Sequence, residues 1–178
     1  MDTKIPTRAL RPSAQDECEI ETCETFQDIM EISSVIMQRY RLDHAVFLSM
    51  PTSDFATVFP ILPMPEQLQR LTLQAVAEKR HPSAEMAGGR TAPLVRLEGL
   101  SSGPYTQKLR SELYGAGLEL VYAVPLGAGV PYVFEVSRGG VGISDDELLD
   151  LQVVGRAIAR KLALPNEDES DEFDYHVR

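Results

Sequence analysis

The fold is decided by two neighbouring stretches, "GAGLELVYAVPL" at residues 115–126 and "VPYVFEVS" at residues 130–137. After the opening Gly-Ala-Gly of the first stretch, both consist mainly of apolar, β-branched and aromatic residues over lengths typical of strands. Only the segment "GAG" at residues 127–129 separates them, and so short a glycine-rich connection indicates a β-hairpin. The second half of the chain is therefore predicted to contain two antiparallel, largely buried strands.

The first half of the chain predicts a second hairpin. Residues 45–50 form a short apolar run that ends before a proline, and residues 55–59 form another. The sequence Thr-Ser-Asp between them favours a turn, so the two runs should pair as antiparallel strands. Pro60, Pro63 and Pro65 should then end regular pairing, because proline lacks the amide hydrogen that a sheet requires.

Two segments of the first half predict helices. Residues 16–40 carry apolar residues at steps of three and four, which is typical of an amphipathic helix, either alone or preceded by a short helical turn. Residues 66–80 repeat this pattern. Lys79, Arg80 and His81 follow at its end, where positive charge would complement the helix dipole.

Two further helices are predicted in the second half. The first covers residues 105–117 and is closed by a glycine. The second begins at Ser144, because Glu147 stands three residues later in the arrangement of a capping box. Gly155 inside this helix costs about 1 kcal/mol relative to alanine, so either another backbone must approach it closely or its presence is incidental. Residues 82–104, rich in glycine and proline, are expected to form a loop.

The predicted order is helix, two strands, helix, loop, helix, two strands, helix. It indicates one α+β domain at residues 16–164, in which an antiparallel β-sheet is flanked by helices on its faces, as in GAF and PAS sensor domains. Residues 1–15 are expected to form a flexible N-terminal segment. Residues 165–178 are expected to form a disordered acidic tail. This tail either improves solubility or binds a partner through Phe173 and Tyr175.

Charge and hydropathy limit the partners of the chain. The formal net charge of −10 over 178 residues is a poor match for nucleic acid, which is bound through lysine and arginine. Apolar runs fall far short of the roughly 20 residues of a membrane span. No basic start precedes a long apolar stretch, so no secretory signal is visible. We therefore expect a cytoplasmic protein that binds neither nucleic acid nor a membrane directly.

The cysteines and histidines predict no metal site. Cys18 and Cys23 lie among glutamates, which raise thiol pKa values and reduce reactivity, so both are expected to be reduced thiols. His44, His81 and His176 are far apart in the sequence, and none stands at ligand spacing from a cysteine. We expect no cofactor and no enzymatic activity.

Carboxylates occur in two places that could carry chemistry. Asp145, Asp146 and Glu147 form a cluster, but the first turn of a helix favours acidic residues through its dipole. Glu135 is a charged residue within an apolar strand. By strand alternation it either faces solvent or points into a pocket, where it would anchor a polar group of a ligand.

Residues 107–162 carry a family resemblance. The segments "QKLRSELYGAGLELVYAVPL" and "GVPYVFEVSRGGVGISDDELLDLQVVGRAIARKL" present a helix, a strand ending in Val-Pro-Leu, a second strand, a Ser-Asp-Asp-Glu cap and a long final helix. This succession resembles the second half of the autoinducer-binding domain of LuxR-type regulators. "SSVIMQRYRLDHAVFLSM" at residues 33–50 is similar to that family's helix followed by its first strand. GAF domains share much of the pattern.

The resemblance implies a non-enzymatic regulatory protein. Such a domain would dimerise with itself or with a transcriptional regulator, and would thereby modulate quorum sensing or transcription, with or without a small apolar ligand. Because no helix-turn-helix is recognised after the domain, it would act by drawing a partner into a complex. The alternative is a free-standing GAF-like small-molecule sensor.

The chain also departs from the family. Members that bind acyl-homoserine lactones carry a tryptophan and tyrosine series and an Asp-Pro pair in their first half. This chain has no tryptophan, and residues 57–71, "TVFPILPMPEQLQRL", contain no Asp-Pro. Val121 stands where the family often has a glycine. The resemblance therefore does not imply an ordinary acyl-homoserine lactone site.

In this fold a ligand would lie between the sheet and the helices on one face. Tyr105 and Tyr122 could each contribute one hydrogen bond inside an otherwise apolar site. The alternative is that the same side chains fill an ordinary core. The predicted lining residues are Val46, Leu48, Val58, Phe59, Tyr105, Tyr122, Val124 and Phe134.

Overall fold

The computed structural model describes residues 12–83 and 104–162, with side chains of the second range from residue 107. Four strands form one antiparallel sheet in the order β2-β1-β4-β3. The strands are β1 (His44–Ser49), β2 (Val58–Pro60), β3 (Val121–Pro125) and β4 (Tyr132–Ser137). Both predicted hairpins are confirmed, and they join through β1 and β4 at the centre of the sheet. The α+β fold class is therefore confirmed.

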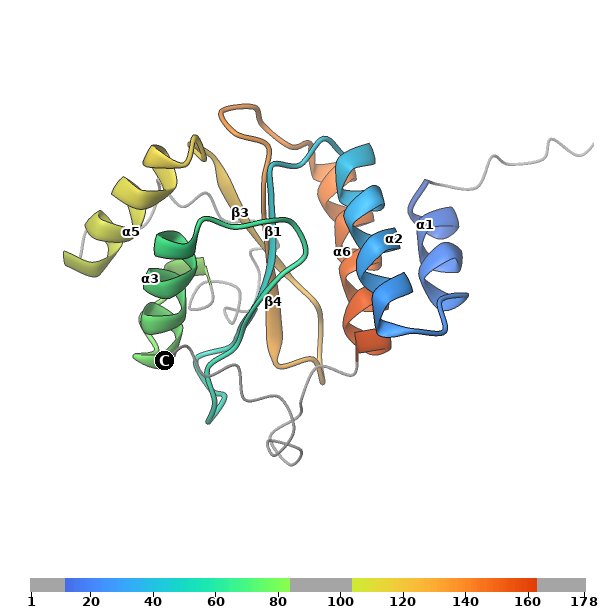
Figure 1. Cartoon of the computed structure of the whole chain (residues 1–178), viewed down its shortest axis with the longest axis horizontal. Helices are drawn as coiled ribbons and strands as arrows, with labels where there is room; N and C mark the ends of the chain where they lie inside the picture. The colour runs from blue at the N-terminus through green and yellow to red at the C-terminus, as the bar shows by residue number, and fades with distance from the viewer. Residues whose placement is uncertain (1–11, 84–103, 163–178) are drawn as a thin grey trace, which may run out of the picture.

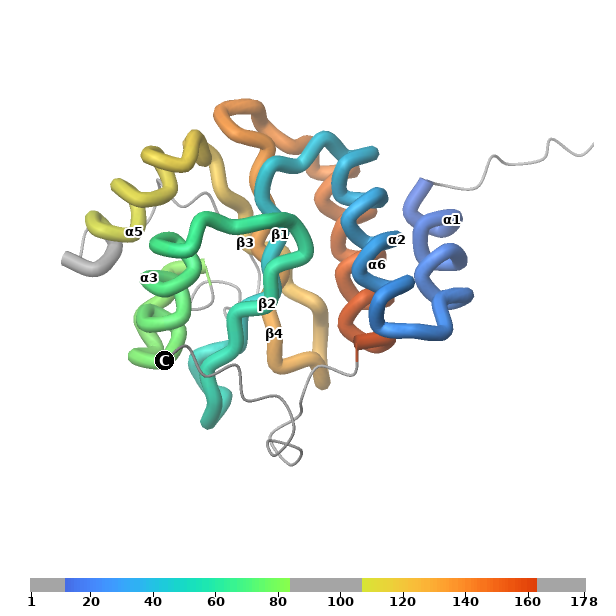
Figure 2. Tube along the Cα trace, in the orientation of Figure 1, coloured from blue at the N-terminus to red at the C-terminus, as the bar shows by residue number. Residues whose placement is uncertain are grey.

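Helices cover both faces of this sheet (Figures 1 and 2). The helices α1 (Pro12–Glu21), α2 (Phe26–Arg39) and α6 (Asp145–Leu162) lie on one side. The helices α3 (Glu66–Ala77) and α5 (Pro104–Gly115) lie on the other. Helix α1 packs on α6, so the first and last helices of the described residues are in contact on one side of the sheet.

The main core fills the side of α1, α2 and α6. Alternate residues of the central strands point to this side, and the rings of Phe47 and Phe134 stack with centroids 4.8 Å apart. Ile36 and Met37 of α2 meet them there, fully buried. Burial of this apolar surface is the principal stabilising contribution to the fold.

Three boundaries differ from the sequence-based expectation. Helix α1 begins at Pro12, so residues 12–15 are helical instead of flexible; proline is well tolerated in a first turn. The helical segment expected over residues 16–40 is divided into two helices, because Thr25 and Asp28 form a capping box that begins α2. The preceding part is a full helix of 10 residues and not only a short turn. Strand β2 is shifted to include Pro60, which a sheet accepts at its edge. Residues 1–11, the loop at 84–103 and the tail at 163–178 lie outside the described residues.

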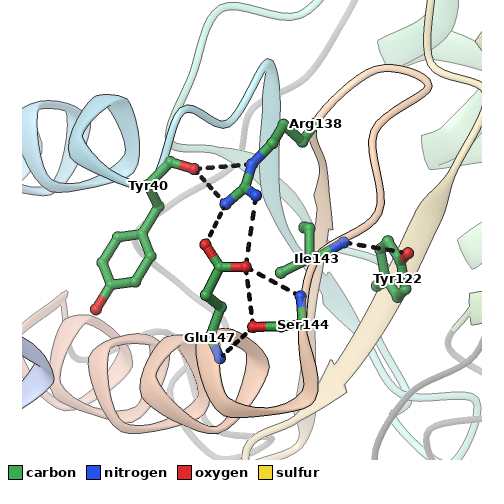
Figure 3. Close-up of polar contacts among 6 residues, drawn as sticks. All are labelled: Tyr40, Tyr122, Arg138, Ile143, Ser144 and Glu147. Carbon is green, nitrogen blue, oxygen red and sulfur yellow. Dashed lines mark hydrogen bonds and ion pairs between the residues drawn. The ribbon is translucent and has the colours of Figure 1, made fainter.

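A polar clamp ties the start of α6 to the end of α2 (Figure 3). Ser144 and Glu147 form the predicted capping box: the backbone N–H of Glu147 donates to Ser144 Oγ, and the Ser144 N–H donates to Glu147 Oε2. Arg138, directly after β4, donates to Glu147 Oε1 at 2.7 Å and to the backbone carbonyl of Tyr40 at 2.7 Å. The Glu147 carboxylate therefore has a structural role.

Candidate functional site

Four polar side chains are buried together on the sheet face that α3 covers. Glu135 and His81 are each 1% exposed, and His44 and Ser83 are 3% and 2% exposed. His44 Nε2 lies 2.8 Å from Glu135 Oε1, and His81 Nε2 lies 3.7 Å from Glu135 Oε2. We call these four residues the polar cluster.

The register of the sheet places Glu135 in the interior. On β4 it stands opposite Val46 of β1 and Ala123 of β3, in the middle of the three strands. Side chains alternate along a strand, so Glu135 and its two partners share the face opposite to that of Phe134. Of the two expectations for Glu135, exposure to solvent is wrong, because a helical layer covers this face as well.

Helix ends position the two histidines. Helix α3 closes with a Schellman motif in which Lys79 has a φ of 55° and the Arg80 N–H donates to the Ala75 carbonyl. The chain then turns back, so His81 enters the interior. Helix α2 closes in the same way: Arg41 has a φ of 56°, and His44 follows as the first residue of β1. The expectation that His81 is a positive charge at a helix end is wrong, because the side chain is buried.

Electrostatics fix the proton positions in the cluster. Burial acts to raise the pKa of Glu135, but His81, the hydrogen bond from His44 and the Ser83 side chain lower that pKa to about 2. Glu135 is therefore ionised and can only accept, so His44 Nε2 donates to it. Burial lowers the pKa of His81, assisted by His44 and opposed by Glu135, and His81 is neutral at pH 7.

The cluster has more hydrogen-bonding capacity than the described protein groups use. Within residues 12–83 and 107–162, Glu135 Oε2 and both ring nitrogens of His81 have no hydrogen-bond partner. The 3.7 Å between Glu135 Oε2 and His81 Nε2 is too long for a direct bond. Each unsatisfied buried polar group costs about 1–3 kcal/mol. Such groups are normally paired with protein, water or a ligand.

An apolar strip continues the same face beyond the polar cluster. Val46 stands opposite Glu135, and two residues along β1, Leu48 stands opposite Val133. The side chain of Val76 packs onto them from α3. The buried members of the strip are Val46, Leu48, Val76, Ala123 and Val133, with Met50, Ala56 and Val58 at the margin. The face is thus amphiphilic, with a charged end and an apolar end.

The structure divides the predicted lining residues between the two faces. Val46, Leu48 and Val58 belong to the apolar strip and its margin. Phe59, Tyr122, Val124 and Phe134 belong to the main core on the opposite face. The side chain of Tyr105 lies outside the described residues.

Tyr122 illustrates the difference between the faces. Its hydroxyl accepts a hydrogen bond from the Ile143 N–H at 3.3 Å, near the start of α6 (Figure 3). This bond holds the connection between β4 and α6. It leaves the side chain on the opposite side of the sheet from Glu135.

The other reactive residue types of the sequence have structural explanations. The hydrogen bond from Arg138 lowers the pKa of Glu147 to about 2, with help from the Ser144 N–H. Cys18 and Cys23 are free thiols; Cys18 is exposed on α1, and burial raises the pKa of Cys23. No three His, Cys, Asp or Glu side chains of the described ranges are arranged to hold a metal ion. No helix in those ranges is long and apolar enough to cross a membrane.

Sequence reasoning missed the meeting of His44 and His81 at Glu135. One signal was available: His44, Val46 and Leu48 alternate along β1, so His44 shares their face once that face is known to be buried. For His81 no such signal exists, because its placement depends on Lys79 adopting a left-handed conformation that usually calls for glycine.

Comparison with solved structures identifies similar folds. A crystal structure of Escherichia coli SdiA matches with a TM-score of 0.64 at 14% identity, covering 93% of this chain and 71% of that chain. SdiA in complex with octanoyl-rac-glycerol matches with a TM-score of 0.62 at 15% identity, covering 85% of this chain. The chain spans 64% of the length of that second structure. No protein-family model and no curated protein sequence matches the chain. The fold predicted from the resemblance to LuxR-type autoinducer-binding domains is therefore confirmed.

Proposed function

We propose that this chain is a non-enzymatic regulatory domain that binds a small amphiphilic molecule between its sheet and helix α3. The observation that carries the proposal is the amphiphilic face: a buried polar cluster with unused hydrogen-bonding atoms adjoins the apolar strip. The SdiA fold supports it, since SdiA has been solved with octanoyl-rac-glycerol, a molecule with an apolar chain and a polar head. Val46, Leu48 and Val58 would line this site, together with Glu135 and the two histidines.

The regulatory part of the proposal concerns association. The domain would transmit ligand binding by pairing with a second copy or with a transcriptional regulator, and so act in quorum sensing or another transcriptional response. The contact of α1 with α6 supports this route, because these helices pack together on one side of the sheet and are the first and last described elements (Figure 1). A free-standing cytoplasmic sensor without a protein partner is the alternative.

Ligand binding is tested with the purified full chain. Medium-chain monoacylglycerols and acyl-homoserine lactones are added, and the melting temperature is followed by circular dichroism, since the chain has no tryptophan. A ligand at about 100 times its Kd should raise the melting temperature by about 5–10 °C. The proposal fails if no compound changes the melting temperature and mass spectrometry of the denatured protein releases no bound molecule.

Association is tested separately. Light scattering after size exclusion should give the mass of a dimer, or a pull-down from native cells should recover a regulator with a helix-turn-helix. A monomer that recovers no partner, but binds a ligand, would instead establish the free-standing sensor.

A further inference from the structure

We propose that the polar cluster selects a ligand whose head is uncharged and donates hydrogen bonds, such as a glycerol ester or an ethanolamide, and that it rejects carboxylates. The inference rests on the ligand-binding function proposed above and specifies the chemical class of the ligand. Four features specify this ligand: the acceptor on Glu135, the donor and acceptor nitrogens of His81, the charge of the site and the apolar strip.

Glu135 offers a ligand one free acceptor atom. Glu135 Oε1 is used by His44, whereas Oε2 has no hydrogen-bond partner among the described groups. The carboxylate is ionised, because the pKa of Glu135 is lowered to about 2. An ionised carboxylate can only accept, so a group that meets Oε2 must carry a donor. Ester and ether oxygens cannot satisfy it.

His81 offers a ligand both a donor and an acceptor. A neutral imidazole has one donor nitrogen and one acceptor nitrogen, and neither nitrogen of His81 has a partner in the described ranges. With Nε2 3.7 Å from Glu135 Oε2, one hydroxyl beside both atoms can donate to the carboxylate and accept from the ring. A second hydroxyl or an amide N–H would meet the remaining nitrogen. A head with two such groups therefore matches the cluster.

The charge of Glu135 disfavours a ligand with an anionic head. Glu135 is fully buried, so an incoming carboxylate would place two negative charges close together where water screens them poorly. His81 is neutral at pH 7 and does not offset this repulsion. Free fatty acids should thus be excluded, although their chains match the apolar strip as well as those of their esters.

The apolar strip matches the acyl chain of such a ligand. From His44 to Leu48 the strand rises about 13 Å, at about 3.3 Å per residue. Over this distance the face changes from the polar cluster to the valines and leucine of the strip. A ligand with its head at Glu135 would therefore lay a medium-length acyl chain along Val46 and Leu48.

The test uses four octanoyl compounds that differ only in their heads. Calorimetry with the full chain at pH 7.5 compares 1-octanoylglycerol, N-octanoylethanolamine, methyl octanoate and octanoate. The first two should bind at least about tenfold more tightly than methyl octanoate, and octanoate should bind most weakly. If none binds, this inference is wrong, whereas the proposed function is decided by the melting temperatures and the mass spectrometry described above. If all bind equally, or octanoate binds best, the inference alone is overturned.

Two variants assign the selectivity to the cluster. Glu135→Gln keeps the size of the side chain but removes its charge, so octanoylglycerol should lose about tenfold in affinity while octanoate gains. His81→Phe removes both nitrogens, and should weaken octanoylglycerol while leaving methyl octanoate unchanged. Glu119→Gln, the same substitution at an exposed position, is the control and should alter neither. An unchanged order of affinities in both folded cluster variants would refute the assignment.

Discussion

At the scale of single residues, Gly155 shows how a locally unfavourable choice is compensated by packing. It lies in the middle of α6, where glycine costs about 1 kcal/mol relative to alanine. A Cβ atom at this position would come within 2.9 Å of both Leu126 Cδ2 and Phe134 Cδ1. The glycine therefore allows α6 to approach the sheet closely. The sequence left open a close approach by another backbone, whereas the atoms that approach Gly155 belong to two side chains.

Gly155→Ala should destabilise the protein. The gain in helix propensity is about 1 kcal/mol, whereas overpacking a core typically costs about 1–3 kcal/mol, so we expect a net loss of up to about 2 kcal/mol. Urea unfolding followed by circular dichroism measures it. Gly115→Ala is the matched control, because a Cβ there has no neighbour within 4 Å. Equal stability of the two variants would contradict the close-packing explanation.

At the scale of elements, Arg138 connects three segments. It follows β4, and its side chain is 16% exposed. It donates hydrogen bonds both to Glu147 in the cap of α6 and to the Tyr40 carbonyl at the end of α2. Carbonyls at the end of a helix have no partner within it. Arg138 therefore supplies the donor that α2 lacks and fixes α2 relative to α6.

Arg138→Met should lower the free energy of unfolding by about 1–3 kcal/mol, because it leaves the Tyr40 carbonyl without its side-chain donor and removes a charged hydrogen bond. Arg160→Met is the matched control. Arg160 bonds to Glu17 and Glu21 on α1, but its side chain is 52% exposed, so its loss should cost no more than about 1 kcal/mol. Urea unfolding compares the two. A larger loss for Arg160→Met would mean that the attachment of α1 matters more than this clamp.

At the scale of the whole molecule, the polar cluster joins segments that are remote in the sequence. His44 belongs to β1, Glu135 to β4, and His81 follows α3. A charged and a neutral titratable group are thus buried between the sheet and its helical cover. Folding and protonation are therefore coupled through this cluster.

The stability of the protein should fall as the pH is lowered from 7 to 5. Burial lowers the pKa of His81 below its ordinary value of 6.5, so the unfolded chain binds a proton in this range that the folded chain does not. Proton binding therefore stabilises the unfolded state relative to the folded state. A further loss should occur between pH 4.5 and pH 2, where Glu135 is protonated only in the unfolded state. Urea unfolding of wild type and His81→Gln at several pH values tests this. An equal slope between pH 7 and pH 5 in both proteins would show that His81 is not responsible.

Much of the architecture could be predicted from the sequence because its signals are local. The short glycine-rich connection predicted the hairpin of β3 and β4, and Ser144 with Glu147 predicted the start of α6. These features depend on neighbouring residues and on alternation or helical periodicity. The shift of β2 escaped prediction, because an edge position for Pro60 depends on which strands pair.

The amino-acid sequence by itself determined the order of helices and strands and the pairing within each hairpin, because these are interactions between near neighbours. Only the tertiary structure decided that the hairpins join through β1 and β4, and which helices cover which face of the sheet. That decision placed Glu135 in the interior and brought it to His44, 91 residues away. The physical reason is that burial and charge pairing at this site depend on strand register and on two left-handed helix ends without glycine, for which the chain carries no local signal.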